Sequence, residues 1–247
     1  MKTYALVCGC DYSGSWKVYQ SCNDAKKFYN ILRDVYQVKR KNIKTLYNNQ
    51  FTRRNILKEL DNFSKKLNEP GVTGIIYVAG HGTSSGDRNN DENDRRDENW
   101  QTYDRRCVVD DEITSILSRT HKDSNLTVIS DCCHSGTVLD FIEKKKNKFN
   151  DRNWLSIGSA LDNQSAIQSG DGSVCSVQLF KILHENHNIT MRNLIYLLKR
   201  YMEKSFIGTM QTCVVNISNE NLYDKEVFYF TEKEFRIICI DDNLVMK

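Results

Sequence analysis

The sequence predicts an α/β fold, arranged as a three-layer α/β/α sandwich around a mainly parallel central sheet. Short apolar segments typical of buried strands alternate along the chain with longer segments whose apolar residues recur at helical spacing. This alternation is the pattern of βαβ units, whose strands are parallel and whose helices cover the faces of the sheet. The composition agrees, because 39% hydrophobic and 27% charged residues over 247 positions are typical of a globular protein.

The expected strands are short, and several end in small or polar residues. Gly74–Ala79 is apolar throughout, which indicates a strand buried on both faces of the sheet. Leu126–Ser130 has the same character, and each of these two strands runs directly into a segment with reactive side chains. In chain order, the expected strands are Thr3–Gly9, Ile43–Tyr47, Gly74–Ala79, Leu126–Ser130, Trp154–Ala160, Gln211–Ile217, Val227–Phe230 and Phe235–Ile240.

The expected helices carry apolar residues three and four positions apart. In Thr52–Leu67 five such residues share one face, as in a helix that packs on a sheet. Asn23 or Asp24 is a candidate N-cap for the first helix, and Thr190 is a candidate for the last. In chain order, the expected helices are Asn23–Tyr36, Thr52–Leu67, Asp110–Arg119, about Thr137–Lys145, about Val174–His187 and Met191–Lys204.

One segment, Asp87–Arg106, has a different composition from the rest of the chain. Its 20 residues include seven acids and five arginines, and Trp100 and Tyr103 are its only large apolar residues. This composition favours a long exposed loop. Loops of this length in compact domains usually have a functional role.

Charge and cysteine content exclude several classes of protein. The formal net charge of only +3 argues against a protein that coats nucleic acid. No apolar run approaches the roughly 18 residues of a membrane span, and the first ten residues are too short and too polar afterwards for a secretory signal to be expected. Nine scattered cysteines indicate mostly reduced thiols, so a cytoplasmic location is expected. We expect one domain over residues 1–247, and a monomer.

Reactive side chains follow two of the expected strands. His81 lies between Gly80 and Gly82, and Cys132 and Cys133 precede a His-Ser-Gly string. Because the carboxyl ends of parallel strands meet at one edge of a sheet, these groups are expected close together. A cysteine nucleophile needs a neighbouring base, which His81 could supply, and the N–H groups of Gly82 and Cys133 could bind an oxyanion.

Each of these motifs alone has a simpler interpretation. A single histidine is more often structural than catalytic, and a Cys-Cys-His string could be part of a metal site. Zinc sites, however, usually have a second pair of ligands at matching spacing, and the chain has no such pair. No zinc is therefore expected, and the two motifs at successive strand ends favour catalysis.

The two strings Tyr77–Gly82 (Tyr-Val-Ala-Gly-His-Gly) and Asp131–Gly136 (Asp-Cys-Cys-His-Ser-Gly) resemble the catalytic motifs of metacaspases, which are caspase-like cysteine peptidases. The resemblance implies a caspase-like fold with Cys133 as the nucleophile and His81 as its dyad partner. It also divides the domain into a large-subunit-like part, about 1–145, and a small-subunit-like part, about 150–247. Further similar segments are Ser21–Ala25, Asp97–Asp104, Asp110–Glu112, Ser159–Ser165 and Gln211–Thr212.

The chain departs from the family pattern in three places. Ala79 stands where the family often has serine, and the connection between Asp104 and Asp110 is shorter than usual. The chain begins directly at the first strand, so no N-terminal prodomain is expected.

Two carboxylates near the catalytic motifs predict a preference for basic substrates. Asp131 lies two residues before Cys133, and Asp24 lies where it could face the same cleft. Two carboxylates on one pocket wall favour arginine or lysine in a polypeptide substrate and reject acidic side chains. Alternatively, Asp24 is a helix N-cap and Asp131 caps the turn after its strand.

A second acidic set matches the calcium site of metacaspases: Asp97, Asp110, Asp111 and Asp140. Carboxylate oxygens without cysteine or histidine suit calcium rather than zinc. The alternative is that Asp110 and Asp111 simply begin a helix, where acidic side chains are favourable.

A basic run follows the nucleophile, and its lysines are candidate self-cleavage sites for an enzyme that selects basic residues: Lys144, Lys145, Lys146 and Lys148. The alternative is a solvated surface charge run. Cys132 is either a redox partner of Cys133 or inert.

The resemblance therefore predicts a cysteine endopeptidase that cleaves after Arg or Lys. Two rivals stay open at this stage. One is a different specificity, such as cleavage after asparagine. The other is a catalytically weak or inactive caspase-like protein that binds proteins or calcium.

Overall fold

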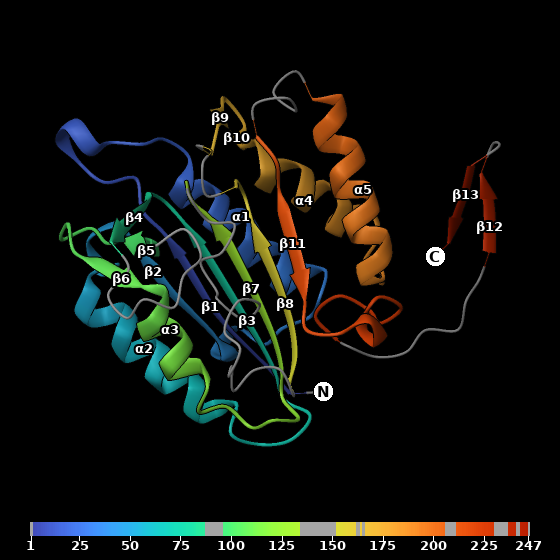
Figure 1. Ribbon diagram of the computed structural model, residues 1–247, viewed down its shortest axis with the longest axis horizontal. Helices are drawn as coiled ribbons and strands as arrows, with labels where there is room; N and C mark the ends of the chain where they lie inside the picture. The colour runs from blue at the N-terminus through green and yellow to red at the C-terminus, as the bar shows by residue number, and fades with distance from the viewer. Residues whose placement is uncertain are drawn as a thin grey trace.

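The computed structural model describes residues 2–86, 96–133, 152–161, 164, 166–205, 211–229, 237–240 and 243–246. Its centre is a six-stranded sheet in the order β11-β8-β7-β3-β1-β2 (Figure 1). Five of these strands are parallel, and β11 pairs antiparallel with β8 at one edge. The strands are β1 Thr3–Gly9, β2 Ile43–Tyr47, β3 Thr73–Ala79, β7 Asn125–Asp131, β8 Asn153–Gly158 and β11 Val214–Ile217.

Helices cover both faces of this sheet, so the fold is the expected α/β/α sandwich (Figure 1). On one face lie α1 (Ser21–Asp34), α4 (Val174–Glu185) and α5 (Met191–Lys204). The opposite face is covered by α2 (Arg53–Lys66) and α3 (Asp110–Leu117). Successive side chains of a strand point to opposite faces, so each central strand contributes to both hydrophobic cores.

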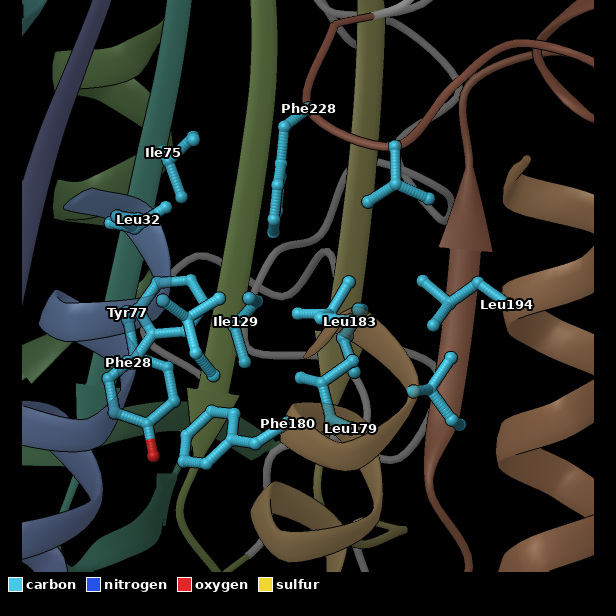
Figure 2. Close-up of a cluster of buried hydrophobic side chains, with 14 of the residues drawn as sticks. Phe28, Leu32, Ile75, Tyr77, Ile129, Leu179, Phe180, Leu183, Leu194 and Phe228 are labelled. Carbon is cyan, nitrogen blue, oxygen red and sulfur yellow. The ribbon is translucent and has the colours of Figure 1, made fainter. Parts of the chain in front are cut away.

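The core under α1 and α4 is rich in aromatic rings (Figure 2). Phe28 of α1 stacks on Tyr77 of β3 with ring centroids 4.7 Å apart, and on Phe180 of α4 at 5.7 Å. Phe28 and Tyr77 are fully buried. Burial of a large apolar side chain contributes about 1.5–3 kcal/mol, so this stack fixes α1 and α4 on the sheet.

Most expected helices and strands are present, with some boundaries shifted. Thr190 caps α5 as predicted, because its hydroxyl accepts a hydrogen bond from the backbone N–H three residues later. Thr52, expected as the first residue of its helix, instead caps α2 through the same kind of contact. The cap prediction for the first helix is wrong. α1 begins at Ser21 after Gln20, and Asp24 is fully buried within its first turn. Its carboxylate points to the sheet edge, where a later segment of chain binds it.

The Asp87–Arg106 segment is not one exposed loop. It contributes β5 (Arg96–Gln101) to a small antiparallel sheet with β4 (Gly82–Gly86) and β6 (Cys107–Val109). Trp100 is fully buried, and its indole N–H donates to the Ser130 hydroxyl over 3.0 Å. The sequence pattern did not predict this strand, because the many charged residues of the segment favoured an exposed loop. Residues 87–95 lie outside the described part of the chain.

Shorter elements complete the described fold. Val227–Tyr229 forms no strand, and the nearby pairing is a single bridge between Thr190 and Glu226; Phe230 lies outside the described residues. The expected helix at about Thr137–Lys145 also lies outside them. The remaining elements are β9 Gln168–Ser169, β10 Gly172–Ser173, β12 Ile237–Ile240, β13 Asn243–Met246 and the 3-10 turns Gly14–Trp16, Arg40–Asn42, Asn48–Gln50 and Glu220–Leu222.

Two cysteines form a disulfide, which qualifies the expectation of mostly reduced thiols. Cys175 at the start of α4 is bonded to Cys213 beside β11. Other cysteines carry free thiols, among them Cys8, Cys10, Cys22, Cys107, Cys132 and Cys133. No described helix is both long and apolar enough to cross a bilayer.

Candidate active site

The carboxyl ends of three neighbouring strands meet at one edge of the sheet. Gly9, Ala79 and Asp131 are the last residues of β1, β3 and β7, and they lie side by side in the strand register. The next residues continue the pairing. The Gly80 N–H donates to the Asp131 carbonyl over 3.2 Å, and the Cys10 N–H donates to the Ala79 carbonyl over 3.0 Å. The segments that carry His81 and Cys133 therefore leave the sheet together.

Gly82 and Cys133 are in direct backbone contact. A Cβ atom built on Gly82 would lie 2.0 Å from the Cys133 carbonyl oxygen and 2.9 Å from the Cys132 Cβ. Any side chain at position 82 would separate the two segments. The glycine after the histidine thus allows close contact between the two segments that carry the N–H groups proposed for oxyanion binding.

The His81 ring is fixed by the loop that follows β1. Its Nε2 lies 2.8 Å from the Trp16 carbonyl oxygen, and the ring packs on Tyr12 with centroids 4.7 Å apart. The His81 backbone N–H donates to the Tyr12 hydroxyl. Since a carbonyl only accepts hydrogen bonds, a neutral His81 carries its proton on Nε2. Nδ1 is then the nitrogen that can accept a proton.

The two adjacent cysteines have different environments. Cys132 is fully buried, and burial raises the pKa of its thiol well above the usual value, with the nearby Asp131 charge adding to the effect. Cys133 is only half-buried, and its Sγ accepts a hydrogen bond from the Ala166 N–H over 3.3 Å. A thiolate is the reactive form of cysteine. Cys133 is therefore the candidate nucleophile, and the buried Cys132 thiol is the less accessible of the two.

Asp131 and Asp24 lie at the same edge, and both are buried. Asp131 accepts hydrogen bonds from the Ser173 hydroxyl over 2.6 Å, from the Ser176 hydroxyl, and from the Tyr77 hydroxyl over 3.3 Å. Burial raises the pKa of the Asp131 carboxyl, while hydrogen bonds from these three hydroxyls and from the Ser159 hydroxyl oppose that rise. Within the described residues, the groups that bind the Asp131 carboxylate are neutral hydroxyls.

A single residue bridges the two carboxylates. The Ser173 N–H donates to Asp24 Oδ2 over 2.8 Å, while its hydroxyl binds Asp131. Gly172 makes this possible, because its φ of 136° is open to glycine and a Cβ there would lie 2.2 Å from Asp24 Oδ1. The β9–β10 hairpin beyond the strand ends thus holds both acids (Figure 1).

Burial also perturbs Asp24. It raises the pKa of this carboxyl to about 6, and the charge of Asp131 adds to the rise. The Ser173 N–H and the Lys27 ammonium, 3.5 Å from Oδ1, act in the opposite direction. Two buried carboxylates held this close together form a site of strongly negative potential, which favours a cation.

The second acidic set is only partly described. Asp110 is buried at the start of α3, and its carboxylate accepts the N–H groups of Glu98 over 3.2 Å and of Asp111 over 2.7 Å. Asp97 precedes Glu98 in β5, so its backbone is close to Asp110. Within the described residues, no cluster of three or more candidate ligands gathers around a point. Asp140 and the candidate lysines, Lys144, Lys145, Lys146 and Lys148, lie outside those residues.

Several residues of the site had no separate signal in the sequence. Trp16 acts through its backbone carbonyl, which any residue provides. Ser173 and Ser176 come from a segment more than 40 positions from Asp131, and isolated serines carry no pattern. Gln211 was noted within a family-like segment, and it links the Ile167 N–H to the Ser159 carbonyl.

Comparison with known proteins identifies the family. The sequence model described as metacaspase, peptidase C14 domain, matches residues 3–142. The chain belongs to the metacaspase family. It is 31% identical over 192 residues to metacaspase-1B of Aspergillus fumigatus, which covers 72% of this chain and 47% of that protein. Metacaspase-1 of Saccharomyces cerevisiae is 31% identical over 147 residues, covering 55% of this chain and 34% of that protein.

The plant and structural relatives extend the comparison. Metacaspase-4 of Arabidopsis thaliana is 26% identical over 147 residues, covering 57% of this chain and 35% of that protein. The chain thus matches about a third to a half of the length of these metacaspases. A crystal structure of a Geobacter sulfurreducens protein superimposes with a TM-score of 0.72 at 20% identity, covering 92% of this chain and 98% of the other. The shared fold confirms the caspase-like α/β architecture.

Proposed function

We propose that this metacaspase is a cysteine endopeptidase that cleaves polypeptides after arginine or lysine. The observation that carries the proposal is the convergence at one sheet edge of Cys133, Gly82 and an oriented His81 with two buried carboxylates. Family membership supports a peptidase activity of the cysteine type.

In the proposed reaction, His81 Nδ1 takes the proton of the Cys133 thiol, and the sulfur attacks the scissile carbonyl carbon. The N–H groups of Gly82 and Cys133 stabilise the oxyanion that forms. When this tetrahedral intermediate collapses, the C–N bond breaks and His81 gives the proton to the leaving amine. Water then attacks the thioester, giving up a proton to His81, and the released thiolate recovers it.

The preference for basic side chains follows from the pocket acids. When an arginine or lysine before the scissile bond enters the pocket, its side chain loses bound water. Contacts with the carboxylates of Asp24 and Asp131 compensate for that loss. An aspartate in the same place would bring a third negative charge to two buried ones. A mismatch of this kind costs several kcal/mol, so discrimination should be strong.

Calcium is proposed as an activator, held by Asp97, Asp110, Asp111 and Asp140. The described residues fit this in part, because Asp110 and the Asp97 backbone are neighbours and the donor atoms are hard oxygens. A bound ion would supply positive charge that relieves carboxylate repulsion and orders the segments before and after the nucleophile. Ordering there would favour self-cleavage among the Lys144–Lys148 residues, giving fragments of about 16 and 12 kDa.

The test of the function uses fluorogenic peptides ending in Arg, Lys, Asn or Asp, with calcium or chelator. We expect release from the Arg and Lys peptides only, at least 100-fold above the Asp peptide. Cys133→Ala should abolish release, and Cys132→Ala should retain most of it, because only Cys133 is accessible. Preferred cleavage after Asp or Asn, an active Cys133→Ala, or no labelling by a cysteine-reactive peptide probe would reject the proposal.

The calcium proposal has its own readout. Activity and self-cleavage, followed on a denaturing gel, should rise across a calcium titration to millimolar concentration. The Asp110→Asn, Asp111→Asn double variant should lose this response while retaining its fold. Equal activity in chelator and in calcium would contradict the calcium proposal. Asp110 and Asp111 would then serve only to begin a helix.

A further inference from the structure

A groove lies at the β2 edge of the sheet, away from the catalytic motifs. It encloses about 500 Å³ between α1 and β2. Lys26 and Tyr29 line it from the helix, Ile43 and Tyr47 line it from the strand, and Arg40 closes its start. It is large enough to take several residues of an extended peptide.

The groove has the charge and surface of a peptide-binding site. Its lining includes the cations Lys26 and Arg40 but no carboxylate. Both cations are exposed, and within the described residues neither belongs to an ion pair of 4.0 Å or less. Lys26 Nζ lies 5.9 Å from the centre of the Tyr47 ring. Two cations beside two tyrosine rings present positive charge over an amphipathic floor.

The backbone of β2 offers a second element of recognition. In the described sheet β2 is terminal and pairs only with β1, so its outer N–H and C=O groups have no strand beside them. Ile43, Thr45 and Tyr47 alternate along the groove side, whereas Leu46 packs in the opposite core. A peptide added to this edge would place every second side chain over the groove.

We propose that this groove binds an extended acidic segment of a polypeptide by strand addition to β2. Acidic side chains facing the groove would meet Lys26 and Arg40. The intervening residues would face the other side, where Lys44 is paired with Glu59. Charge complementarity selects acidic over basic partners, and backbone pairing selects extended ones.

The groove leads toward the catalytic edge. β2 ends at Tyr47, and the next residue, Asn48, accepts the Asp11 N–H in the loop that carries Trp16. An acidic segment bound along β2 therefore belongs to a protein substrate whose basic cleavage site lies further along its chain. This last step rests on the proposed function, whereas binding to the groove does not.

Binding is tested first on the Cys133→Ala protein. This variant should not cleave the peptide, so the measurement reports binding alone. The probe is a fluorescein-labelled eight-residue peptide in which threonine alternates with glutamate, followed by fluorescence anisotropy. The Lys26→Glu, Arg40→Glu double variant should bind at least tenfold more weakly. The Lys58→Glu, Lys199→Glu variant has the same change in net charge at exposed positions elsewhere, and it should bind within twofold of the parent.

Backbone pairing is tested with the same peptide N-methylated at alternate residues. Only every second N–H of an added strand faces the edge, so one methylation frame should abolish binding and the other should preserve it. Equal binding by both double variants, or equal binding of both methylated peptides, would overturn the proposal.

The role in substrate selection is tested with active protein. A short Arg reporter should be cleaved equally by the parent and by the Lys26→Glu, Arg40→Glu variant. The same reporter joined to the acidic peptide by a flexible linker should gain at least tenfold in kcat/KM, only in the parent. Failure to cleave either reporter would count against the proposed function, whereas equal cleavage of both would count against the groove.

Discussion

Two pairs of acids in this protein look alike in composition and behave differently in the fold. Asp24 and Asp131 are 107 positions apart, yet one serine bridges them at the carboxyl edge of the sheet. Asp110 and Asp111 are adjacent in the chain and begin a helix, where the Asp110 carboxylate accepts backbone N–H groups. The first pair brings two buried carboxylates together, with Lys27 beside Asp24 and hydroxyl donors around Asp131, while the second is stabilised locally at a helix start. Spatial convergence, and not the density of acids in the sequence, brings two buried carboxylates together at the strand ends.

The largest expected effect separates the two pairs directly. Asp131→Asn should reduce kcat/KM for an Arg reporter by at least 100-fold, since a buried cation–carboxylate contact is worth about 3 kcal/mol. Asp111→Asn is the matched isosteric control, and assayed in chelator it should stay within twofold of the parent. Similar losses in both variants would show that the pairs are not functionally distinct.

The next effect concerns stability. Burial raises the Asp24 pKa to about 6, above the roughly 3.9 of an unfolded chain. The folded state therefore holds the proton more tightly, and stability falls as pH rises from about 4 to 6. Asp24→Asn should raise the free energy of unfolding by about 1–3 kcal/mol at pH 8 and leave it nearly unchanged at pH 4. Denaturant unfolding at the two pH values measures this, and a loss of stability at pH 8 would contradict it.

The same carboxyl should shape the pH dependence of activity. Below pH 6 Asp24 becomes protonated in the free enzyme, so kcat/KM for an Arg reporter should fall by up to about tenfold per pH unit. The Asp24→Asn variant should lack this acidic limb while keeping any limb that belongs to His81 or Cys133. If the pH profile of kcat/KM is the same in the Asp24→Asn variant as in the parent, the acidic limb belongs to the His81–Cys133 dyad and not to Asp24.

The smallest effect belongs to the helix start. Glu112 lies in the first turn of α3, reaches back to the Val109 N–H over 3.4 Å, and pairs with Arg53. Glu112→Gln should lower the free energy of unfolding by only about 0.5–1 kcal/mol, without altering specificity, because the pair is partly solvated. A changed preference between Arg and Asp reporters would link α3 to the substrate pocket.

Sequence reasoning succeeded where the signal is local. Thr190 caps α5 as the sequence predicted, because a hydroxyl at that position accepts the N–H three residues later, whatever surrounds it. It failed where tertiary contact decides. Asp24 resembles a cap but is turned into the pocket by Ser173, and the charged residues around Trp100 conceal a buried strand.

The same distinction applies to the site. The sequence predicted that the groups after two successive parallel strands lie close together, and Gly82 is in contact with Cys133. Nothing local indicates that the Trp16 carbonyl orients His81, because its contribution is a backbone atom. The sequence also does not indicate which hydroxyls bind Asp131, because Tyr77, Ser173 and Ser176 belong to three separate elements.

The pairing of β7 with β8 has a consequence for a processed form of the protein. Any backbone break between residues 133 and 152 would fall between these two strands, yet their six-residue parallel ladder and the stack of Phe28 on Phe180 would still join the pieces. The N-terminal piece would hold the thiol, the imidazole and both pocket acids, and the C-terminal piece would hold Ser173 and Ser176. The nicked protein would then be an obligate heterodimer, assembled before it was cut, whose specificity is lost on dissociation and not on cleavage.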